Sequence, residues 1–247
     1  MNKEEYLLPG ERIDDLQLKG LQIIQNPEWF CFGMDAVLLS GFVPAGAKGN
    51  LMDLGCGNGI LPILLSAKTR CSTLTGLEIQ GRVAQMAQRS VRMNGLEDRI
   101  SILEGDIREA GRAFAPASFD IVTSNPPYMV KEHGLLTREG PRAAARHEIF
   151  CTFRDVALAA RHLLKQKGHF YLVHRPFRLV EILLQLREAD LEPKRLRMVH
   201  PFADKEPNMV LIDAVRDGRS GITVEPPLFV FDREGVFTPE LREIYGS

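Results

Sequence analysis

From about residue 50 onward, short apolar runs alternate with longer segments whose apolar positions recur at helical spacing. The short runs have the length and composition of buried strands, and each longer segment presents one apolar face. The pattern predicts strands at 49–54, 73–78, 100–103, 119–124 and 168–174, and helices at 60–68, 81–94, 150–167 and 178–188. This alternation indicates an α/β fold with a mostly parallel sheet covered by helices on both faces.

The pattern changes at both ends of the chain. Two extended runs, 195–200 and 208–215, are joined by a polar loop and predict an antiparallel hairpin at one edge, which completes a seven-stranded sheet. Residues 12–32 alternate weakly, as a hairpin would, and Asp35 is predicted to cap a short helix over 36–42. We expect an N-terminal hairpin and covering segment, a central α/β domain and an irregular C-terminal wrap, with bounds 1–45, 46–220 and 221–247.

Composition excludes several classes of protein. No apolar run approaches the roughly 20 residues that a membrane span requires. Residues 1–6 carry acids and no apolar signal core, so we expect a cytoplasmic protein with no membrane contact. No Cys-x-x-Cys pair occurs among the four cysteines, so we predict neither a metal site nor a disulfide framework; they are Cys31, Cys56, Cys71 and Cys151.

Charge is nearly balanced over the whole chain but uneven along it. The net charge of −1 argues against a broadly basic nucleic-acid binder. The stretch 131–178, however, carries ten Lys or Arg against four Asp or Glu, and five of the six histidines. Such a cationic band could follow a phosphate backbone, but charge alone favours an ordinary solvated helix face with basic residues.

A glycine-rich turn, Asp-Leu-Gly-Cys-Gly-Asn-Gly at 53–59, follows the first strand of the alternating region. Glycines there let the backbone approach a ligand beyond the carboxyl ends of the strands. The spacing differs from the dinucleotide fingerprint and from the phosphate-binding P-loop. Glu78 ends the second strand, where a carboxylate can hold a ribose diol, and Asp106 follows the third, where it could accept from an adenine amine. Each acid alone could be a solvated loop carboxylate, but the set favours a nucleotide site.

The most specific element is the sequence Ser-Asn-Pro-Pro-Tyr at 124–128, directly after the fourth strand. A planar amine is a poor nucleophile because its lone pair is delocalised into the ring. Acceptors for both amine hydrogens favour a pyramidal transition state. The Asn125 side chain and the Pro126 carbonyl are candidate acceptors, Pro127 stiffens the turn, and Tyr128 offers a face for stacking a base. Taken alone, the segment could also be a simple proline turn.

Together, the glycine turn, the acids and Asn-Pro-Pro-Tyr resemble the class I S-adenosylmethionine-dependent methyltransferases over roughly 30–215. The resemblance implies a Rossmann-like sheet, S-adenosyl-L-methionine as cofactor and S-adenosyl-L-homocysteine as product. It implies that the cofactor is bound by Phe32, Asp35, Asp53, Gly55, Cys56, Gly57, Asn58, Gly59, Glu78, Ile79, Asp106, Ile107 and Asn125. Asn-Pro-Pro-Tyr is typical of enzymes that methylate adenine, cytosine or glutamine amide nitrogens. The implied catalytic residues are therefore Asn125, Pro126, Pro127 and Tyr128.

The flanking segments 30–39, 199–211 and 226–228 resemble the bacterial tRNA1(Val) (adenine-37 N6)-methyltransferase family. This resemblance implies an RNA partner and methyl transfer to N6 of adenine-37 in a tRNA anticodon loop. Loop bases are already partly unstacked, so extruding one costs little. Four basic side chains after the motif could contact loop phosphates, or could simply be surface charges: Arg138, Arg142, Arg146 and His147. The sequence leaves the oligomeric state open.

Other functions share parts of this pattern. A release-factor type protein glutamine N5-methyltransferase has the same motif but typically carries a helical N-terminal domain, whereas the residues before 50 look extended here. A DNA adenine methyltransferase would need a target-recognition domain, which we do not expect in this chain. Ribosomal RNA guanine methyltransferases usually have Phe-His after the prolines, unlike Tyr128-Met129. A non-catalytic scaffold that retains the cofactor fold is the remaining alternative, and the intact Asn125 and Tyr128 favour an enzyme.

Overall fold

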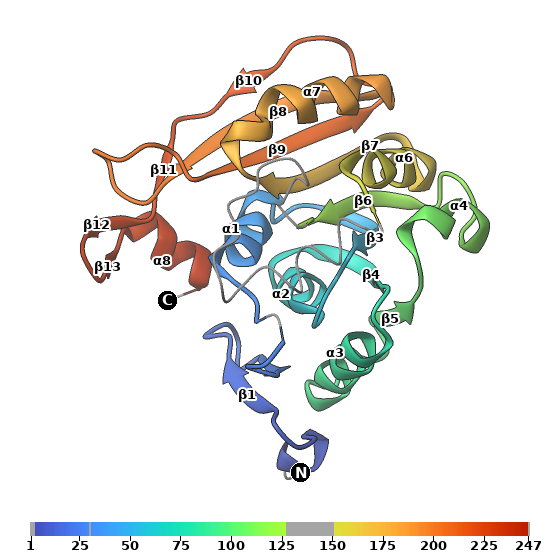
Figure 1. The fold of residues 1–247 in the computed structure, drawn as a ribbon, viewed down its shortest axis with the longest axis vertical. Helices are drawn as coiled ribbons and strands as arrows, with labels where there is room; N and C mark the ends of the chain where they lie inside the picture. Colours follow the sequence, from blue (N-terminus) through green and yellow to red (C-terminus); the bar gives the residue numbers. More distant parts are fainter. Residues whose placement is uncertain (1–2, 30, 127–150, 247) are drawn as a thin grey trace.

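A computed structural model of the chain describes residues 3–29, 31–126 and 151–246. In this described part, a central sheet of nine strands has the order β10-β8-β9-β7-β6-β3-β4-β5, with β11 also pairing with β8 (Figure 1). The strands are β3 (Lys48–Leu54), β4 (Arg70–Glu78), β5 (Ile100–Glu104), β6 (Phe119–Ser124), β7 (Leu164–His174), β8 (Leu191–His200), β9 (Met209–Arg216), β10 (Thr223–Val224) and β11 (Leu228–Phe229). Strands β3 to β7 are parallel, and β9 runs antiparallel between β7 and β8. The predicted α/β sheet with an antiparallel C-terminal pair is confirmed, and the short strands β10 and β11 extend it beyond the seven strands predicted.

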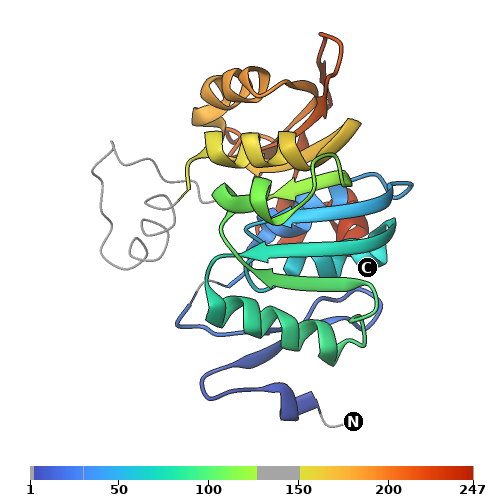
Figure 2. The ribbon, with the colours of Figure 1, turned by 90° about the vertical axis from the view of Figure 1, so that its right-hand side faces the viewer.

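Helices cover both faces of this sheet (Figures 1 and 2). One face packs against α1 (Met34–Phe42), α2 (Ile60–Lys68), α3 (Gly81–Met93) and α8 (Pro239–Tyr245). The other packs against α4 (Ala110–Ala113), α6 (Phe153–Leu163) and α7 (Leu179–Glu188). Short 3-10 turns lie at η1 (Lys3–Tyr6), η2 (Ile107–Glu109) and η3 (Pro176–Arg178). None of the helices in these ranges is both long and apolar enough to cross a membrane.

The two cores follow from side-chain alternation along the central strands. In β9, Val210 and Ile212 belong to the core on the α6 side, and Leu211 belongs to the core on the α1 side. All three are fully or nearly fully buried, at 0–1% exposure. A strand buried on both faces is apolar at consecutive positions, which is why these strands read as continuous apolar runs in the sequence.

The predicted N-terminal hairpin is present and is fixed on α3. Strands β1 (Arg12–Asp15) and β2 (Gln22–Gln25) pair antiparallel. The Ile24 N–H donates to the Ser90 hydroxyl at 3.0 Å. The Asn94 side chain accepts from the Gln22 N–H at 3.0 Å and donates to the Gln22 carbonyl at 2.6 Å. Side chains of α3 and of its C-cap residue therefore take the place of a further strand along the free edge of β2.

The helix predicted over 150–167 is too long, and residue 150 lies outside the described ranges. Helix α6 begins at Phe153 with a capping box, formed by the N-cap residue Thr152 and by Asp155 in its first turn, and ends at Leu163. Strand β7 begins at once, because Leu164 pairs with Phe119 of β6. The polar run that follows Leu164 lacks strand-like alternation. Its place in the sheet is set by pairing with β6 and by a 2.8 Å ion pair between Lys165 and Asp120.

The C-terminal segment is more regular than predicted. Strands β10 and β11 flank Pro226-Pro227 and extend the sheet along β8. A two-stranded hairpin follows, formed by β12 (Phe231–Arg233) and β13 (Val236–Phe237). Thr238 caps α8 by accepting from the Leu241 N–H at 3.2 Å. The chain thereby returns to α1, against which α8 packs.

Candidate functional site

Three predicted elements of the site lie side by side at the carboxyl edge of the sheet. Leu54 of β3 pairs with Leu77 of β4 on one side and with Ser124 of β6 on the other. The glycine-rich turn starts after Leu54, Glu78 follows Leu77, and Asn125 follows Ser124. Segments separated by about 20 to 70 positions in the chain therefore emerge next to one another. This is the edge at which open α/β sheets bind their ligands.

The three glycines of the turn share a positive φ, but the space around each of them differs. Gly55, Gly57 and Gly59 have φ values of +74°, +54° and +84°, in the region that side chains disfavour. A Cβ at Gly59 would lie 3.2 Å from the Cβ of Ala87, so Gly59 allows α2 to start close against α3. A Cβ at Gly57 would meet no atom of the described residues within 4 Å. Gly57 thus borders open space, as a backbone cradle for a ligand would.

Glu78 holds the turn from the β4 side. Its side chain is buried, and Oε2 accepts from the Gly57 N–H at 3.0 Å while Oε1 accepts from the Gln80 N–H at 2.9 Å. A carboxylate has about four acceptor sites, so these two bonds leave capacity for a ribose diol. The predicted contact with a ribose is chemically compatible with this arrangement and stays a prediction.

Asp53 lies beneath the turn and is fully buried, at 0% exposure. Its Oδ1 accepts from the Thr123 hydroxyl at 2.7 Å, and its Oδ2 has no hydrogen-bond partner among the described residues. Burial raises the pKa of this carboxyl to about 7, the Thr123 bond opposes that rise, and the charge of Glu78 adds to it. A buried carboxylate oxygen without a partner is costly unless a donor or a cation reaches it.

Strand β6 is tied to β3 directly before the amine motif. Besides the Thr123–Asp53 bond, the Ser124 hydroxyl donates to the Leu54 carbonyl at 2.9 Å. Sequence reasoning did not single out Thr123. The available signal was a hydroxyl in a buried strand, which needs a partner when it is buried.

Of the predicted catalytic residues, Asn125 and Pro126 are described, and both follow the end of β6. Asn125 is partly buried and Pro126 is buried. The remaining residues predicted for chemistry or RNA contact lie outside the described ranges: Pro127, Tyr128, Arg138, Arg142, Arg146 and His147. The roles predicted for all of these residues stay predictions.

Asp106 and its neighbours lie at the other side of the turn. The Asp106 carboxylate caps η2 by accepting from the Arg108 N–H at 2.9 Å and forms an ion pair with the Arg108 side chain. These bonds with Arg108 lower the pKa of Asp106. Ile107 approaches the turn, since its Cδ1 would lie 3.8 Å from a Cβ at Gly55, and Ile79 is 37% exposed. The predicted contacts of Asp106, Ile79 and Ile107 with an adenine stay predictions.

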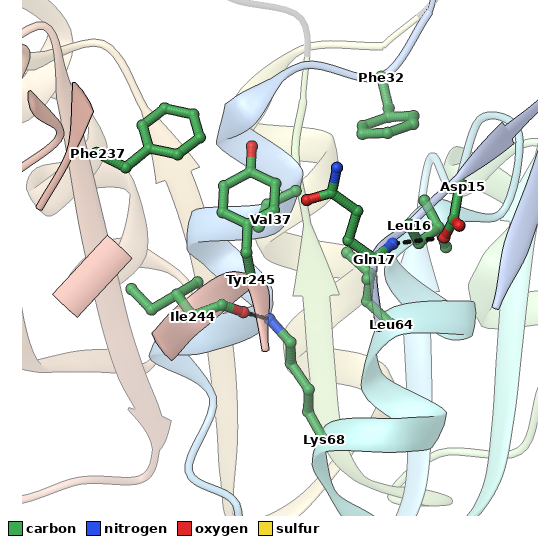
Figure 3. A pocket seen from close by; sticks show the side chains of 10 residues that line it. All are labelled: Asp15, Leu16, Gln17, Phe32, Val37, Leu64, Lys68, Phe237, Ile244 and Tyr245. Atoms are coloured by element: carbon green, nitrogen blue, oxygen red, sulfur yellow. Dashed lines mark hydrogen bonds between the residues drawn. The ribbon is translucent and has the colours of Figure 1, made fainter. Parts of the chain in front are cut away.

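The segment predicted to cover the cofactor contacts the turn through Gln25. The Phe32 N–H donates to Gln25 Oε1 at 2.9 Å, and the Asn58 side chain donates to the same oxygen at 3.3 Å. The Phe32 ring lines a cavity of about 150 Å³ together with Val37 and Leu64 (Figure 3). Gln25 was not predicted, because a glutamine at the end of a weak hairpin carries no local signal for this contact.

The prediction that Asp35 caps the helix is wrong. Helix α1 begins at Met34 with Gly33 as its N-cap residue, and Gly33 has no side chain with which to cap. Asp35 lies within the first turn, where its Oδ1 accepts from the Ala36 N–H at 2.9 Å. An acid in the first turn is still favoured by the helix dipole, which explains why the residue type resembles a cap.

Gly76 is a third residue that the sequence interpretation missed, after Thr123 and Gln25. It lies within β4, and a Cβ there would come within 2.7 Å of the Cys56 sulfur and 2.8 Å of the Ile102 side chain. Cys56 is buried, so the glycine turn sits directly on the strand and leaves no room for a methyl group at Gly76. A glycine inside a strand often marks such a close approach, and that was the available signal.

Comparison with known proteins gives three kinds of similarity. The sequence profile of the methyltransferase small domain family matches residues 32–189. A tRNA1(Val) (adenine(37)-N6)-methyltransferase of Aeromonas salmonicida is 30% identical, covering 73% of this chain and 74% of that protein. The protein of the same name from Porphyromonas gingivalis is 28% identical over 84% of both chains.

Solved structures share the fold at lower sequence identity. A predicted O-methyltransferase of Agrobacterium tumefaciens aligns with a TM-score of 0.70 at 23% identity, covering 86% of this chain and 96% of that one. A 16S rRNA N2 G1207 methyltransferase of T. thermophilus, in complex with AdoMet and guanosine, aligns with a TM-score of 0.61 at 22% identity, covering 85% of this chain and 52% of that one. At this identity the structural likeness establishes the architecture of the sheet and its helices.

Proposed function

The chain belongs to the methyltransferase small domain family of S-adenosylmethionine-dependent enzymes, and from that premise we propose that it methylates the N6 amine of an adenine in RNA. The specific acceptor that we propose is adenine-37 in the anticodon loop of tRNA1(Val). One observation carries the proposal: Leu54 and Ser124 are direct neighbours in β3 and β6. The residues that follow them open the glycine-rich turn and the Asn-Pro-Pro-Tyr motif, which need to be adjacent for methyl transfer.

Two features of the turn fit the cofactor. The buried Oδ2 of Asp53 has no partner among the described residues and can accept from the cofactor's ammonium group. The open side of Gly57 leaves space for a ligand against the backbone. Glu78 and Asp106 would bind the ribose and the adenine amine, flanked by Ile79 and Ile107. When bound, S-adenosylmethionine supplies a methyl group activated by a positively charged sulfur.

In the proposed reaction the chain's own residues align the amine with the methyl group. This alignment matters more than deprotonation of the amine by a strong base. The Asn125 side-chain oxygen and the Pro126 carbonyl accept hydrogen bonds from the two amine hydrogens. These bonds would favour a pyramidal nitrogen, whose lone pair would form the new N–C bond as the S–CH3 bond breaks. The methylated nitrogen would then lose one of its two protons to water. Tyr128 stacks on the extruded base, and Pro127 restricts the turn between them. Most of the rate enhancement then comes from alignment.

The names of the relatives support RNA as the proposed substrate. Those at 28–30% identity are named tRNA1(Val) (adenine(37)-N6)-methyltransferases. An anticodon-loop base is partly unstacked, so the enzyme would extrude it at little cost. Arg138, Arg142, Arg146 and His147 are the proposed phosphate contacts. Binding through phosphates releases counterions, so RNA affinity is expected to fall steeply as salt rises. An affinity independent of salt would remove these four residues from the proposal.

The decisive experiment offers the purified chain radiolabelled S-adenosylmethionine with total tRNA, total ribosomal RNA and a release factor in parallel. Label is expected in tRNA, and mass analysis of the nucleosides is expected to identify N6-methyladenosine. A tRNA1(Val) transcript with guanine in place of adenine-37 is the matched control and should remain unlabelled. Label in the release factor would identify a glutamine N5-methyltransferase instead. Cofactor binding with no transfer to any substrate would favour a non-catalytic scaffold.

A further inference from the structure

Gln25 connects three segments of the chain through one buried carboxamide. The residue ends β2 and is 2% exposed. Its Oε1 accepts from the Phe32 N–H at 2.9 Å and from the Asn58 side chain at 3.3 Å. Its Nε2 donates to the carboxylate of Asp14 on the neighbouring strand β1. The hairpin, the covering segment around Phe32 and the glycine-rich turn therefore meet at this side chain.

The position of Gln25 is fixed independently of the turn. Strand β2 is held on α3 through the Ser90 hydroxyl and through the Asn94 side chain, which forms two bonds with Gln22. Asp14 in turn holds the nitrogen end of the Gln25 carboxamide, which orients the oxygen toward Phe32 and Asn58. The acceptor is thus presented by a packed element and does not depend on the turn for its own orientation.

The glycine-rich turn is held on two sides as a result. On the β4 side, the Gly57 N–H donates to Glu78. On the hairpin side, the Asn58 side chain, itself only 5% exposed, donates to Gln25. Glycines make this turn conformationally free in the absence of such bonds. Holding a loop in its binding conformation reduces the entropy lost when a ligand binds.

We propose that Gln25 is a positioning residue for the cofactor. Its carboxamide oxygen keeps the turn, through Asn58, and the covering segment, through the Phe32 N–H, in the geometry that binds S-adenosylmethionine. This inference rests on the cofactor lying at the glycine-rich turn, and it is independent of which substrate is methylated. Without the oxygen, the buried Asn58 amide and the partly buried Phe32 N–H lose their acceptor, and the turn is released on one side. Cofactor affinity is expected to fall about tenfold or more.

The test compares Gln25→Met with Gln22→Met. Methionine keeps the volume and apolar stem of glutamine and removes both polar atoms. Gln22 lies on the same strand, and its side chain accepts only a surface bond from Lys3, at 2.6 Å, among the described residues. Calorimetric titration with S-adenosylhomocysteine is expected to show the loss of affinity for Gln25→Met alone. Thermal unfolding of both variants measures how much of that loss accompanies a loss of stability.

A double variant that exchanges the acid and the amide between positions 14 and 25 shows why affinity is lost in Gln25→Met. It separates the loss of the positioning oxygen from general damage to the hairpin. In the double variant Gln25→Glu with Asp14→Asn, the new carboxylate can accept from Phe32 and Asn58, while the new amide donates to it from position 14. This variant is expected to bind S-adenosylhomocysteine within about threefold of the parent. If Gln25→Met does not fold, the affinity of this double variant for S-adenosylhomocysteine still tests the proposal.

The sole tryptophan provides a second readout. Trp29 lies in the turn between Gln25 and the covering segment, where its backbone N–H donates to the Asn26 carbonyl at 3.0 Å. Its fluorescence is expected to change when S-adenosylhomocysteine binds the parent and the double variant. Equal affinity losses for Gln25→Met and Gln22→Met, unchanged affinity for Gln25→Met, or failure of the double variant to restore binding would each overturn the proposal. Because no RNA is present, failure of RNA methylation would leave this result intact.

Discussion

The Thr123 hydroxyl donates a 2.7 Å hydrogen bond to Asp53 Oδ1, its direct neighbour across the parallel strands β6 and β3. Both side chains are fully buried, at 0% exposure. One strand continues into the glycine-rich turn and the other into Asn125. The bond therefore joins the strand end that leads into the glycine-rich turn to the strand end that leads into Asn125, and a shift of one strand relative to the other would break it.

Replacing Thr123 by valine keeps the shape of the side chain and removes this donor. Leaving a buried acceptor unsatisfied is expected to lower the free energy of unfolding by about 1–3 kcal/mol. It should also raise the pKa of Asp53 further, because the Thr123 bond is what opposes the effect of burial. Urea unfolding checks the first effect. Thr73→Val is the control, since the Thr73 hydroxyl donates to Asn50 at an exposed position; equal losses in the two variants would contradict the prediction.

Asp53 should make stability depend on pH. Its pKa is about 7 in the folded protein against an ordinary value of 3.8, so between those values the folded state holds a proton that the unfolded state releases. The contribution to stability is therefore fully present below about pH 4 and is lost as pH rises toward about 7. Asp53→Asn cannot titrate, so the parent should lose stability relative to this variant across that window. Urea unfolding at several pH values measures the difference, and a difference independent of pH would rule the assignment out.

Alanine at Gly57 should abolish cofactor binding. The new Cβ would project into space that no described residue fills within 4 Å, where the ligand is proposed to lie. Gly95→Ala is a close control, because Gly95 also has a positive φ, +64°, and an open Cβ direction, but lies just after the C-cap residue of α3. Both variants are expected to lose about 1 kcal/mol through backbone strain. Calorimetry with S-adenosylhomocysteine should separate them, and similar affinities for the two would refute this placement of the ligand.

Asn125→Ala should separate chemistry from cofactor binding. If the Asn125 oxygen accepts from the amine mainly in the transition state, its loss should slow single-turnover methyl transfer by about 100- to 1000-fold. Affinity for S-adenosylhomocysteine should stay within about threefold of the parent. Asn50→Ala, at the start of β3 and away from the turn, should leave both unchanged. Parallel loss of rate and affinity in Asn125→Ala would show that Asn125 holds the site together instead.

The sequence alone determined the alternating architecture and the order of the chemical elements along it. Apolar periodicity reports which side of each segment is buried, so the predicted helix over 60–68 coincides with α2, and the strand 119–124 coincides with β6. Parallel strands present their carboxyl ends at one edge. The sequence therefore predicts that the glycine turn, Glu78 and Asn125 lie together at this edge.

Tertiary structure decided the contacts that hold this edge in shape. Asp53 and Thr123 are 70 positions apart, and Gln25 and Asn58 are 33 apart, so no local pattern specifies either bond. The start of β7 at Leu164 likewise depends on pairing with β6 rather than on its own residues. Local periodicity encodes which face of an element is buried, whereas a buried hydrogen bond depends on where two distant backbones come to lie. Only the packed sheet and hairpin fix that geometry.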